Sequence, residues 1–386
     1  METLKNIEIF DTAYGGYGVG KNRDGQIVFV SGAVEGDICD IKITEKKKSF
    51  LYGKIKNINK PSDYRVEATC KQADKCGGCS FCHINYDYQL IIKEKIIKNI
   101  FRKFNNFPNI ITHKSNGIDY RIRAKVRAKN GKVGFIGFKS NDFIPVDNCQ
   151  IIKPSLFNKI KEFANVNNLS GEVEGLETPD EIFFANVKSN YQIKDKSLFN
   201  GISINGKYSG LKYSSYNTKF GDVGVTCGSF FQSNRFLIDE FQEKAISLVP
   251  EYLSVAELYA GSGFFTCGLI NNRQVKATEF NQRAVELGKI YNLPIVAMDS
   301  GRFLKKIKDI DVVFLDPPRA GVDNNVIKEI LRIKPLYIIY VSCNPQTLSR
   351  DIIKLSDSYK IETYDFFDMF RDTYHIESIV LLSKSN

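Results

Sequence analysis

The C-terminal part of the chain constrains the fold most strongly, because apolar strand-like runs alternate there with helical segments from about Phe220 onwards. The expected strands are Ser254–Leu258, Gln274–Thr278, Pro294–Ala297, Val312–Leu315, Leu336–Val341, Ile361–Asp365 and Ile376–Leu382. Such alternation predicts an α/β domain with a doubly wound, mainly parallel sheet of the Rossmann type. The last two runs have no clear helix between them, so we expect an antiparallel edge there.

The rest of the chain is β-rich. Residues 1–58 alternate short β-type runs with glycine turns, a pattern typical of a small OB-like barrel. The three lysines Lys46–Lys48 at an expected loop tip fit a basic contact and a solvated turn equally well. Residues 59–215 are expected to form a small β-rich central domain with a helix at about Tyr88–Phe104, and residues 216–386 the α/β domain.

Composition narrows the functional class. The chain has 386 residues and a formal net charge of +10, which favours a polyanionic partner without proving one. No run approaches the roughly 20 apolar residues of a membrane span, and the N-terminus lacks a signal-peptide pattern. We therefore expect a cytoplasmic protein, without a membrane partner and monomeric.

The segment Arg121–Lys129 alternates strictly between cations and apolar residues, so its five cations would share one face of a strand. Like charges in a row repel one another, and an anion such as a phosphate backbone lying across them would relieve the repulsion. The alternative is an exposed strand that is protected from edge pairing by its charge. We favour the nucleic-acid interpretation because of the positive net charge.

Several polar residues follow the expected strands, where α/β sheets bind ligands. Gly261 and Gly263 would let backbone amides approach a ligand after the first strand, and Glu279 after the second is placed to bind ribose hydroxyls. Asp299 and Asp316 follow the third and fourth strands. Glu279 and Asp299 also fit helix N-caps, an interpretation we rank lower. An acidic site without a phosphate-binding turn suits S-adenosylmethionine better than a dinucleotide.

A cysteine follows the fifth expected strand in the run Val341–Pro345. Most unpaired cysteines are small buried hydrophobes, but Cys343 precedes a probable helix whose N-terminal dipole would favour the thiolate. Glu377 enters the final strand among apolar residues, where partial desolvation would raise its pKa towards neutrality. The pair therefore suggests a nucleophile and a base, although an edge-strand charge would also explain Glu377.

The nine cysteines lie in a chain without a secretory signal, so a metal site or catalysis is a better explanation than disulfides. Cys70, Cys76 and Cys79 surround a glycine turn, and Cys149 lies far downstream. Four thiolates suit either tetrahedral zinc or an iron–sulfur cluster, and the spacing favours neither. Cys82 and His83 are weaker rival ligands.

Taken together, these motifs resemble the RNA 5-methyluridine methyltransferases, enzymes that use S-adenosylmethionine on tRNA or 23S ribosomal RNA. The matching segments are Phe231–Asn234, Glu257–Gly263, Asp316–Gly321, Ser342–Pro345 and Asp368–Glu377. The resemblance covers nearly the whole chain and makes the first 58 residues a TRAM-like barrel. One departure is Arg371, where family members usually have proline.

The resemblance implies roles for individual residues. Gln232, Tyr259, Glu279 and Asp316 would bind S-adenosylmethionine, Cys343 would be the nucleophile and Glu377 the general base. Cys343 would add to carbon 6 of a flipped-out uracil, carbon 5 would take the methyl group, and Glu377 would remove the carbon 5 proton. The resemblance also implies that Cys70, Cys76, Cys79 and Cys149 hold a [4Fe–4S] cluster with a structural or RNA-docking role.

The sequence is also compatible with two alternative functions. RNA cytosine-5 methylation is disfavoured because Arg319 stands where such enzymes often have a second catalytic cysteine. An RNA-binding or assembly protein without activity is disfavoured because Cys343 and Glu377 are both retained. The motifs do not distinguish tRNA from ribosomal RNA as the substrate.

Overall fold

The computed structural model describes residues 2–385, which form two compact units. The first unit comprises the chain up to Arg102 together with Phe135–Ile144 and Phe370–His375. The second comprises Lys103–Gly134, Pro145–Met369 and the chain from Ile376 onwards. Within residues 2–385, no helix has both the length and the apolar character needed to cross a membrane.

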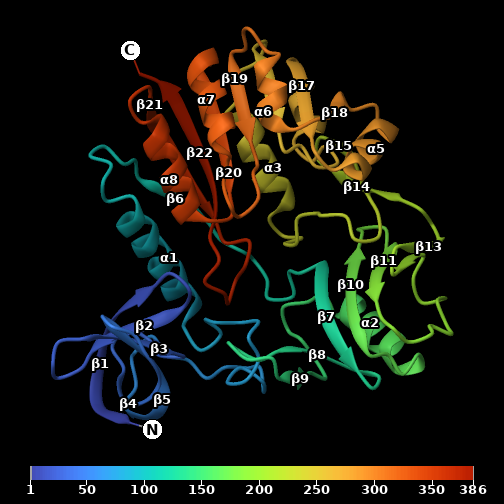
Figure 1. The fold of residues 1–386 in the computed structure, drawn as a ribbon. Helices are drawn as coiled ribbons and strands as arrows, with labels where there is room; N and C mark the ends of the chain where they lie inside the picture. The colour runs from blue at the N-terminus through green and yellow to red at the C-terminus, as the bar shows by residue number, and fades with distance from the viewer. Residues whose placement is uncertain (1, 386) are drawn as a thin grey trace. The chain divides into compact units, whose positions relative to one another are not determined.

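The first unit contains the expected barrel, drawn in blue in Figure 1. Its strands are β1 (Thr3–Ala13), β2 (Tyr17–Lys21), β3 (Ile27–Ser31), β4 (Ile38–Lys46) and β5 (Phe50–Lys60). They close in the order β1-β2-β3-β5-β4. Alternate residues point inwards, as Val28 and Val30 show, and both are fully buried in the barrel core. The OB-like barrel predicted from the glycine-punctuated runs is confirmed.

Helix α1 (Tyr86–Ile100) of the first unit holds separate chain segments together. It begins after Asn85, whose side chain caps the backbone N–H groups of Asp87 and Tyr88. The buried Gln89 amide donates to the carbonyl oxygens of Phe81 and Ile84 and to the Asp372 carboxylate. Its own oxygen accepts from the Asp372 backbone N–H at 3.0 Å. The cysteine-bearing segment, the helix and the distant segment Phe370–His375 are therefore joined by one side chain.

The second unit contains most of two larger sheets, a small hairpin and most of the helices, whereas residues 135–136 and 143–144 of the first of these sheets belong to the first unit. The first sheet has the order β13-β12-β11-β10-β7-β8-β9. Its strands are β7 (Arg123–Lys129), β8 (Lys132–Ile136), β9 (Phe143–Pro145), β10 (Gly171–Glu177), β11 (Phe183–Lys188), β12 (Gly201–Ile204) and β13 (Lys207–Gly210). Helix α2 (Pro154–Val166) packs against β10 and begins at a proline, which suits a first helical position. The hairpin β14 (Ser214–Thr218) and β15 (Gly221–Val225) follows.

Strand β7 offers a second explanation for the alternating cations, besides the nucleic-acid interpretation, which stays a prediction. The alternation itself is confirmed, because Ala124, Val126 and Ala128 are buried and the cations lie on the other face. However, the neighbouring strand β10 pairs antiparallel with β7 and supplies the anions. Glu174 forms an ion pair with Arg123, and Glu172 pairs with Lys125 at 2.7 Å and with Arg127 at 3.3 Å. Repulsion along the strand is thus relieved within the sheet, and no bound polyanion is needed to explain it.

The second sheet has the order β18-β17-β16-β19-β20-β22-β21-β6. Its strands are β6 (Ile110–His113), β16 (Ser254–Leu258), β17 (Gln274–Glu279), β18 (Ile295–Ala297), β19 (Val312–Leu315), β20 (Tyr337–Ser342), β21 (Tyr359–Phe367) and β22 (Glu377–Lys384). The helices are α3 (Ile238–Ser247), α4 (Thr266–Leu269), α5 (Gln282–Ile290), α6 (Ser300–Lys305), α7 (Asn324–Ile333) and α8 (Pro345–Leu355). Figure 1 shows α6, α7 and α8 beside this sheet.

The strands β18, β17, β16, β19 and β20 pair parallel, as expected for a Rossmann-like sheet. The antiparallel strand is also present, since β22 pairs antiparallel with both β20 and β21. It is not an edge strand, however, because β21 and then β6 continue the sheet beyond it. The expectation of an antiparallel edge was therefore wrong in position, and the edge strand β6 was not predicted.

Candidate active site

The polar residues predicted as a site meet at one edge of the second sheet. Because β16, β17, β19 and β20 are parallel, their C-terminal ends at Leu258, Glu279, Leu315 and Ser342 share that edge. Strand β22 runs the other way, so its first residue, Glu377, lies at the same edge. The sheet topology alone thus gathers residues that are far apart in the sequence.

Cys343 and Glu377 are brought together by the pairing of β20 with β22. Ser342 is opposite Ser378, so the next residue on each strand, Cys343 and Glu377, continues the antiparallel register. Glu377 is 6% exposed, and burial raises its pKa well above the usual range, helped by the charge of Asp316. The expected desolvated carboxylate is therefore present.

The thiol of Cys343 differs from expectation in its acidity. Helix α8 does begin at Pro345, directly after the Asn344 N-cap. Nevertheless, burial raises the pKa of Cys343 to about 12, and the charges of Glu377 and Asp316 add to the effect. The helix N-terminus does not produce a thiolate in the site as it stands, so the thiol is protonated near neutral pH.

Three further carboxyl groups surround the ends of β16, β17 and β19. Burial raises the pKa of Asp316 to about 7, with a contribution from the charge of Glu279. Glu257 accepts a hydrogen bond from the Thr266 hydroxyl at 2.6 Å, and burial raises its pKa to about 8. Buried carboxyl groups with raised pKa values, such as Asp316 and Glu257, are common where a site handles protons or binds a cation.

The turn after β16 forms a cradle beside Glu279. Tyr259, Gly261 and Gly263 all have positive φ angles, of 63°, 57° and 99°. The Gly261 N–H donates to Glu279 Oε2 at 3.0 Å, and the Asn281 N–H donates to Oε1 at 2.7 Å. Each carboxylate oxygen keeps a free lone pair, so Glu279 can still accept from ligand hydroxyls. Glu279 is not a helix N-cap, because Asn281 caps α5.

A pocket of about 400 Å³ lies next to this turn. It is lined by Phe280, Ala297, Met298, Asp299, Arg302 and Lys306. The Phe280 ring is 82% exposed and offers an aromatic face. Asp299 caps α6 through the Arg302 N–H at 3.0 Å, so the N-cap interpretation, ranked lower, is correct for this residue. The Tyr259 hydroxyl lies nearby, hydrogen-bonded to Ser300.

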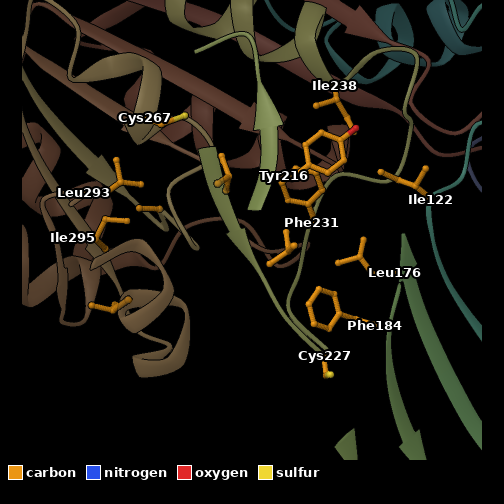
Figure 2. Close-up of a cluster of buried hydrophobic side chains, with 14 of the residues drawn as sticks. Ile122, Leu176, Phe184, Tyr216, Cys227, Phe231, Ile238, Cys267, Leu293 and Ile295 are labelled. Carbon is orange, nitrogen blue, oxygen red and sulfur yellow. The ribbon is translucent and has the colours of Figure 1, made fainter. Parts of the chain in front are cut away.

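Gln232 lies on the loop between β15 and α3 and is 8% exposed. Its neighbour Phe231 is anchored in the hydrophobic cluster of Figure 2, where its ring lies 4.4 Å from that of Tyr216. On the other side, the buried Asn234 donates from Nδ2 to the Ser115 hydroxyl at 3.0 Å and to the Met369 carbonyl at 3.2 Å. The loop that presents Gln232 is therefore fixed at both ends.

Arg319 was not predicted as a site residue from the sequence. It is exposed on the loop after β19, and its charge lowers the pKa of both Cys343 and Glu377 against the effect of burial. The sequence did contain one indication of this role, because Arg319 lies three residues after Asp316, just beyond the end of a predicted strand. The site thus contains a cation that acts on the pKa of both a thiol and a buried carboxyl group.

The cysteines proposed as metal ligands are not assembled. Within residues 2–385, no three Cys, His, Asp or Glu side chains form a group that could hold a metal ion. Cys70, Cys76 and Cys79 belong to the first unit and Cys149 to the second. The charge of Cys70 raises the pKa of Cys76, so these two thiols do lie near each other. As placed, the residues do not fit a [4Fe–4S] cluster, and the cluster prediction is not supported.

Comparisons with known proteins identify the family of the chain. A family model described as tRNA (Uracil-5-)-methyltransferase matches residues 224–385, and a TRAM domain model matches residues 5–56. An uncharacterised RNA methyltransferase of Nanoarchaeum equitans is 30% identical over 436 residues, covering 98% of this chain and 92% of that protein. The chain belongs to the RNA uracil-5 methyltransferase family.

Two further similarities cover almost the whole enzyme. The 23S rRNA (uracil(1939)-C(5))-methyltransferase RlmD of Shewanella halifaxensis is 28% identical, covering 95% of this chain and 92% of that protein. The crystal structure of Pyrococcus abyssi tRNA (uracil-54, C5)-methyltransferase in complex with S-adenosyl-L-homocysteine has a TM-score of 0.78 at 24% identity. It covers 97% of this chain and 99% of that chain, and it shows the shared fold. The predicted family, the Rossmann-like fold and the TRAM barrel are confirmed.

Proposed function

We propose that this enzyme transfers a methyl group from S-adenosylmethionine to carbon 5 of uracil in structured RNA. The observation that carries the proposal is the meeting of Cys343 and Glu377 at adjacent strand ends, beside Asp316 and Arg319. Family membership supports the reaction type. A thiol and a buried carboxyl group side by side are what addition to carbon 6 and removal of a proton from carbon 5 require.

The turn after β16 and the pocket beside it fit the methyl donor. S-adenosylmethionine supplies an electrophilic methyl group on a sulfonium centre. We assign the ribose hydroxyls to Glu279, whose oxygens are already oriented by two backbone N–H groups. The open Phe280 face suits the adenine ring, and Tyr259, Asp316 and Gln232 are assigned to the methionine side. Negative charge from Asp316 would favour the sulfonium.

Cys343 is assigned as the nucleophile. Burial keeps its thiol protonated in the site without ligands, so the proton must leave as substrate binds. Arg319 is the cation that opposes burial at Cys343 and would favour the thiolate. The thiolate then forms a bond to carbon 6 of the uracil, and the electron pair of the 5,6 double bond moves to give an enolate at carbon 5 and oxygen 4.

Glu377 is assigned as the base. The enolate carbon 5 takes the methyl group as the bond from the methyl group to sulfur breaks and S-adenosylhomocysteine leaves. The proton on carbon 5 must then be removed before the bond to Cys343 can break. The raised pKa of the buried Glu377 makes its carboxylate a stronger base for this proton than an exposed glutamate, while the charge of Arg319 lowers the pKa and so favours the ionised form. Loss of the proton restores the double bond and releases the thiolate. The uracil must be unstacked from the RNA to reach the half-buried Cys343 and the buried Glu377.

The decisive experiment is methyl transfer from radiolabelled S-adenosylmethionine to unmodified tRNA and 23S ribosomal RNA, with 5-methyluridine identified after nuclease digestion. We expect the purified enzyme to label one of them and Cys343→Ala to be inactive. Cys227→Ala, which changes a cysteine of the hydrophobic cluster in Figure 2, serves as a matched control that keeps activity. Labelled 5-methylcytidine, or no product with either RNA, would refute the proposal.

The RNA substrate remains to be assigned between tRNA and ribosomal RNA. Both a tRNA methyltransferase and a 23S ribosomal RNA methyltransferase are among the similar proteins. Mapping of 5-methyluridine in RNA from cells lacking the gene assigns the target directly. Loss at a tRNA position or at a ribosomal position identifies the substrate.

The iron–sulfur cluster rests on the spacing of Cys70, Cys76 and Cys79 and on the resemblance alone. No step of the proposed reaction passes through it, since the reaction involves no electron transfer. Iron and acid-labile sulfide measured in anaerobically purified protein test the cluster, with Cys76→Ala as the comparison. Colourless protein that contains zinc, or no metal, would refute it.

A further inference from the structure

The loop between β19 and α7 carries two residues of the site, Asp316 and Arg319. Asp316 is tied to strand β16 by its N–H, which donates to the Leu258 carbonyl at 3.4 Å. Arg319 instead lies on a tight turn, closed by the Gly321 N–H donating to the Pro318 carbonyl at 2.8 Å. The part of the loop that bears Arg319 therefore needs other contacts to stay in place.

Helix α8, which begins two residues after Cys343, supplies these contacts. The side chains of Asn344 and Thr347 both donate to the Arg319 carbonyl oxygen at 3.2 Å. Arg350 donates from Nη2 to the Ala320 carbonyl at 2.8 Å. The strand end with the thiol and the turn with the cation are thus attached to the same helix.

Asp351 of α8 also holds the loop, and it does so from a fully buried position. Its side chain is fully buried, and its Oδ2 accepts two hydrogen bonds of 2.9 Å, from the Val322 N–H and from the Tyr340 hydroxyl. Tyr340 is itself fully buried in β20, three residues before Cys343. Arg350 pairs with the other oxygen, Oδ1, at 2.8 Å. One carboxylate therefore joins the strand, the helix and the loop.

Gly321 shows how closely the loop rests on this carboxylate. Its φ angle is +79°, in the left-handed region, and a Cβ atom at this position would lie 2.3 Å from Asp351 Oδ2. A turn this tight against a buried charged group has little room to shift. A neutral or shorter side chain at Asp351 would leave the Val322 N–H or the Tyr340 hydroxyl poorly paired.

We propose that Asp351 is a positioning residue for methyl transfer, which fixes the Arg319 turn so that the guanidinium faces Cys343 and Glu377. The inference rests on the proposed function, since it concerns the reacting pair of that reaction. Asp351 touches neither substrate nor the reacting atoms and acts only through Arg319. Loosening the turn moves Arg319 away from the thiol, while Asp316 stays on its strand and keeps opposing ionisation of the thiol.

The test is a double-mutant cycle read out on the thiol itself. The full-length enzyme is treated with iodoacetamide at fixed pH without RNA or S-adenosylmethionine, and alkylation of Cys343 is followed by peptide mass spectrometry. Because the rate follows the thiolate fraction, Arg319→Gln should slow alkylation about threefold to tenfold. Asp351→Asn should slow it similarly, and the double variant should be no slower than Arg319→Gln alone.

The control is Glu177→Gln, which removes another buried carboxylate, paired with Lys153 in the other sheet. It should leave the rate of Cys343 alkylation unchanged in each background, equal to that of the wild type in the wild-type background and to that of Arg319→Gln alone in the Arg319→Gln background. If Asp351→Asn does not fold, as judged by thermal melting, Arg350→Met is used instead, because it breaks the bonds to Ala320 and to Asp351 and predicts the same pattern.

Alkylation of Asp351→Asn at the wild-type rate or faster overturns the proposal, as does a double variant whose slowing is the product of the two single effects. A wild-type rate for Arg319→Gln overturns it too, because the cation would then not act on the thiol. Failure of the proposed function can be distinguished from failure of this inference. In that case the wild-type protein methylates no RNA, but the alkylation rates of the four proteins in the cycle can still be measured.

Discussion

At the scale of single residues, burial sets the chemistry of the site. Burial raises the pKa of both Cys343 and Glu377, and the charge of Arg319 lowers the pKa of both against this effect. A base that is shielded from water and close to the reacting carbon is more effective at neutral pH than an exposed base. This arrangement makes the two catalytic assignments separable by experiment, because each is needed at a different step.

Glu377→Gln should stop the reaction after methyl transfer, since glutamine has the same shape but cannot accept the carbon 5 proton. We expect turnover to fall by about 10²–10⁴-fold, while a methylated RNA joined covalently to Cys343 accumulates. Denaturing gels with labelled RNA measure the adduct. Glu362→Gln, which changes an exposed glutamate of β21, is the control and should turn over normally. Slow turnover without any adduct would contradict the assigned order of steps.

Glu257 should make the stability of the enzyme depend on pH. Its pKa is about 8 in the native state against 4.5 for the ordinary group, so between these values the native state binds more protons than the unfolded chain. Stability must therefore fall as pH rises from about 5 to 8, by up to about 1.4 kcal/mol per pH unit from this group. Glu257→Gln should reduce the fall in urea melts, whereas the exposed Glu286→Gln should not. A steeper fall in Glu257→Gln would contradict the sign.

At the scale of elements, strand β7 shows how a neighbouring strand can explain a charge pattern that the sequence alone attributes to a nucleic acid. The alternation of Arg121–Lys129 predicted the exposed face correctly, but the sequence does not say which strand lies beside it. Strand β10 begins more than 40 residues after β7 and brings Glu172 and Glu174 opposite the cations. Cross-strand charge is a property of the pairing and not of the strand.

The charges of β7 should therefore contribute little to RNA binding. We expect Lys125→Met to leave both the affinity and the salt dependence unchanged, because this lysine is already paired with Glu172. The double variant Glu172→Gln and Glu174→Gln frees the cations and should bind RNA more tightly, with a steeper salt dependence. Filter binding at several salt concentrations measures both. A salt slope reduced by about one in Lys125→Met would restore the nucleic-acid interpretation.

Strands that are marked by a local pattern in the sequence could be predicted. The bounds of β16 and β19 agree with the prediction, because each is a short apolar run followed by a turn or polar group. Strand β6 was missed because Ile110–His113 has only four residues and is fixed by pairing with β21, far along the chain. For the same reason Arg319 and Asp351 were not recognised as partners of Cys343. Their roles depend on loops that meet only in the folded sheet.

At the scale of the whole molecule, the first unit is assembled from separate parts of the chain. The short segment Phe370–His375 belongs to it, although the segment lies between β21 and β22 of the other unit. Arg371, which replaces the usual family proline, packs its guanidinium 4.0 Å from the Tyr86 ring centroid. Asp372 has a φ angle of 62°, which an aspartate adopts only when its surroundings hold it there.

Gln89 should therefore be needed to keep this discontinuous unit together. Gln89→Met has a similar volume but removes the hydrogen bonds to Phe81, Ile84 and Asp372, leaving buried groups unpaired. We expect a loss of about 2–4 kcal/mol in stability and faster hydrogen exchange in peptides covering 81–90 and 370–375. Peptides from β16 and β19 should exchange as in the wild type. Gln282→Met, which removes an exposed bond to Glu286, is the control. Unchanged exchange at 370–375 would show that other contacts hold the segment.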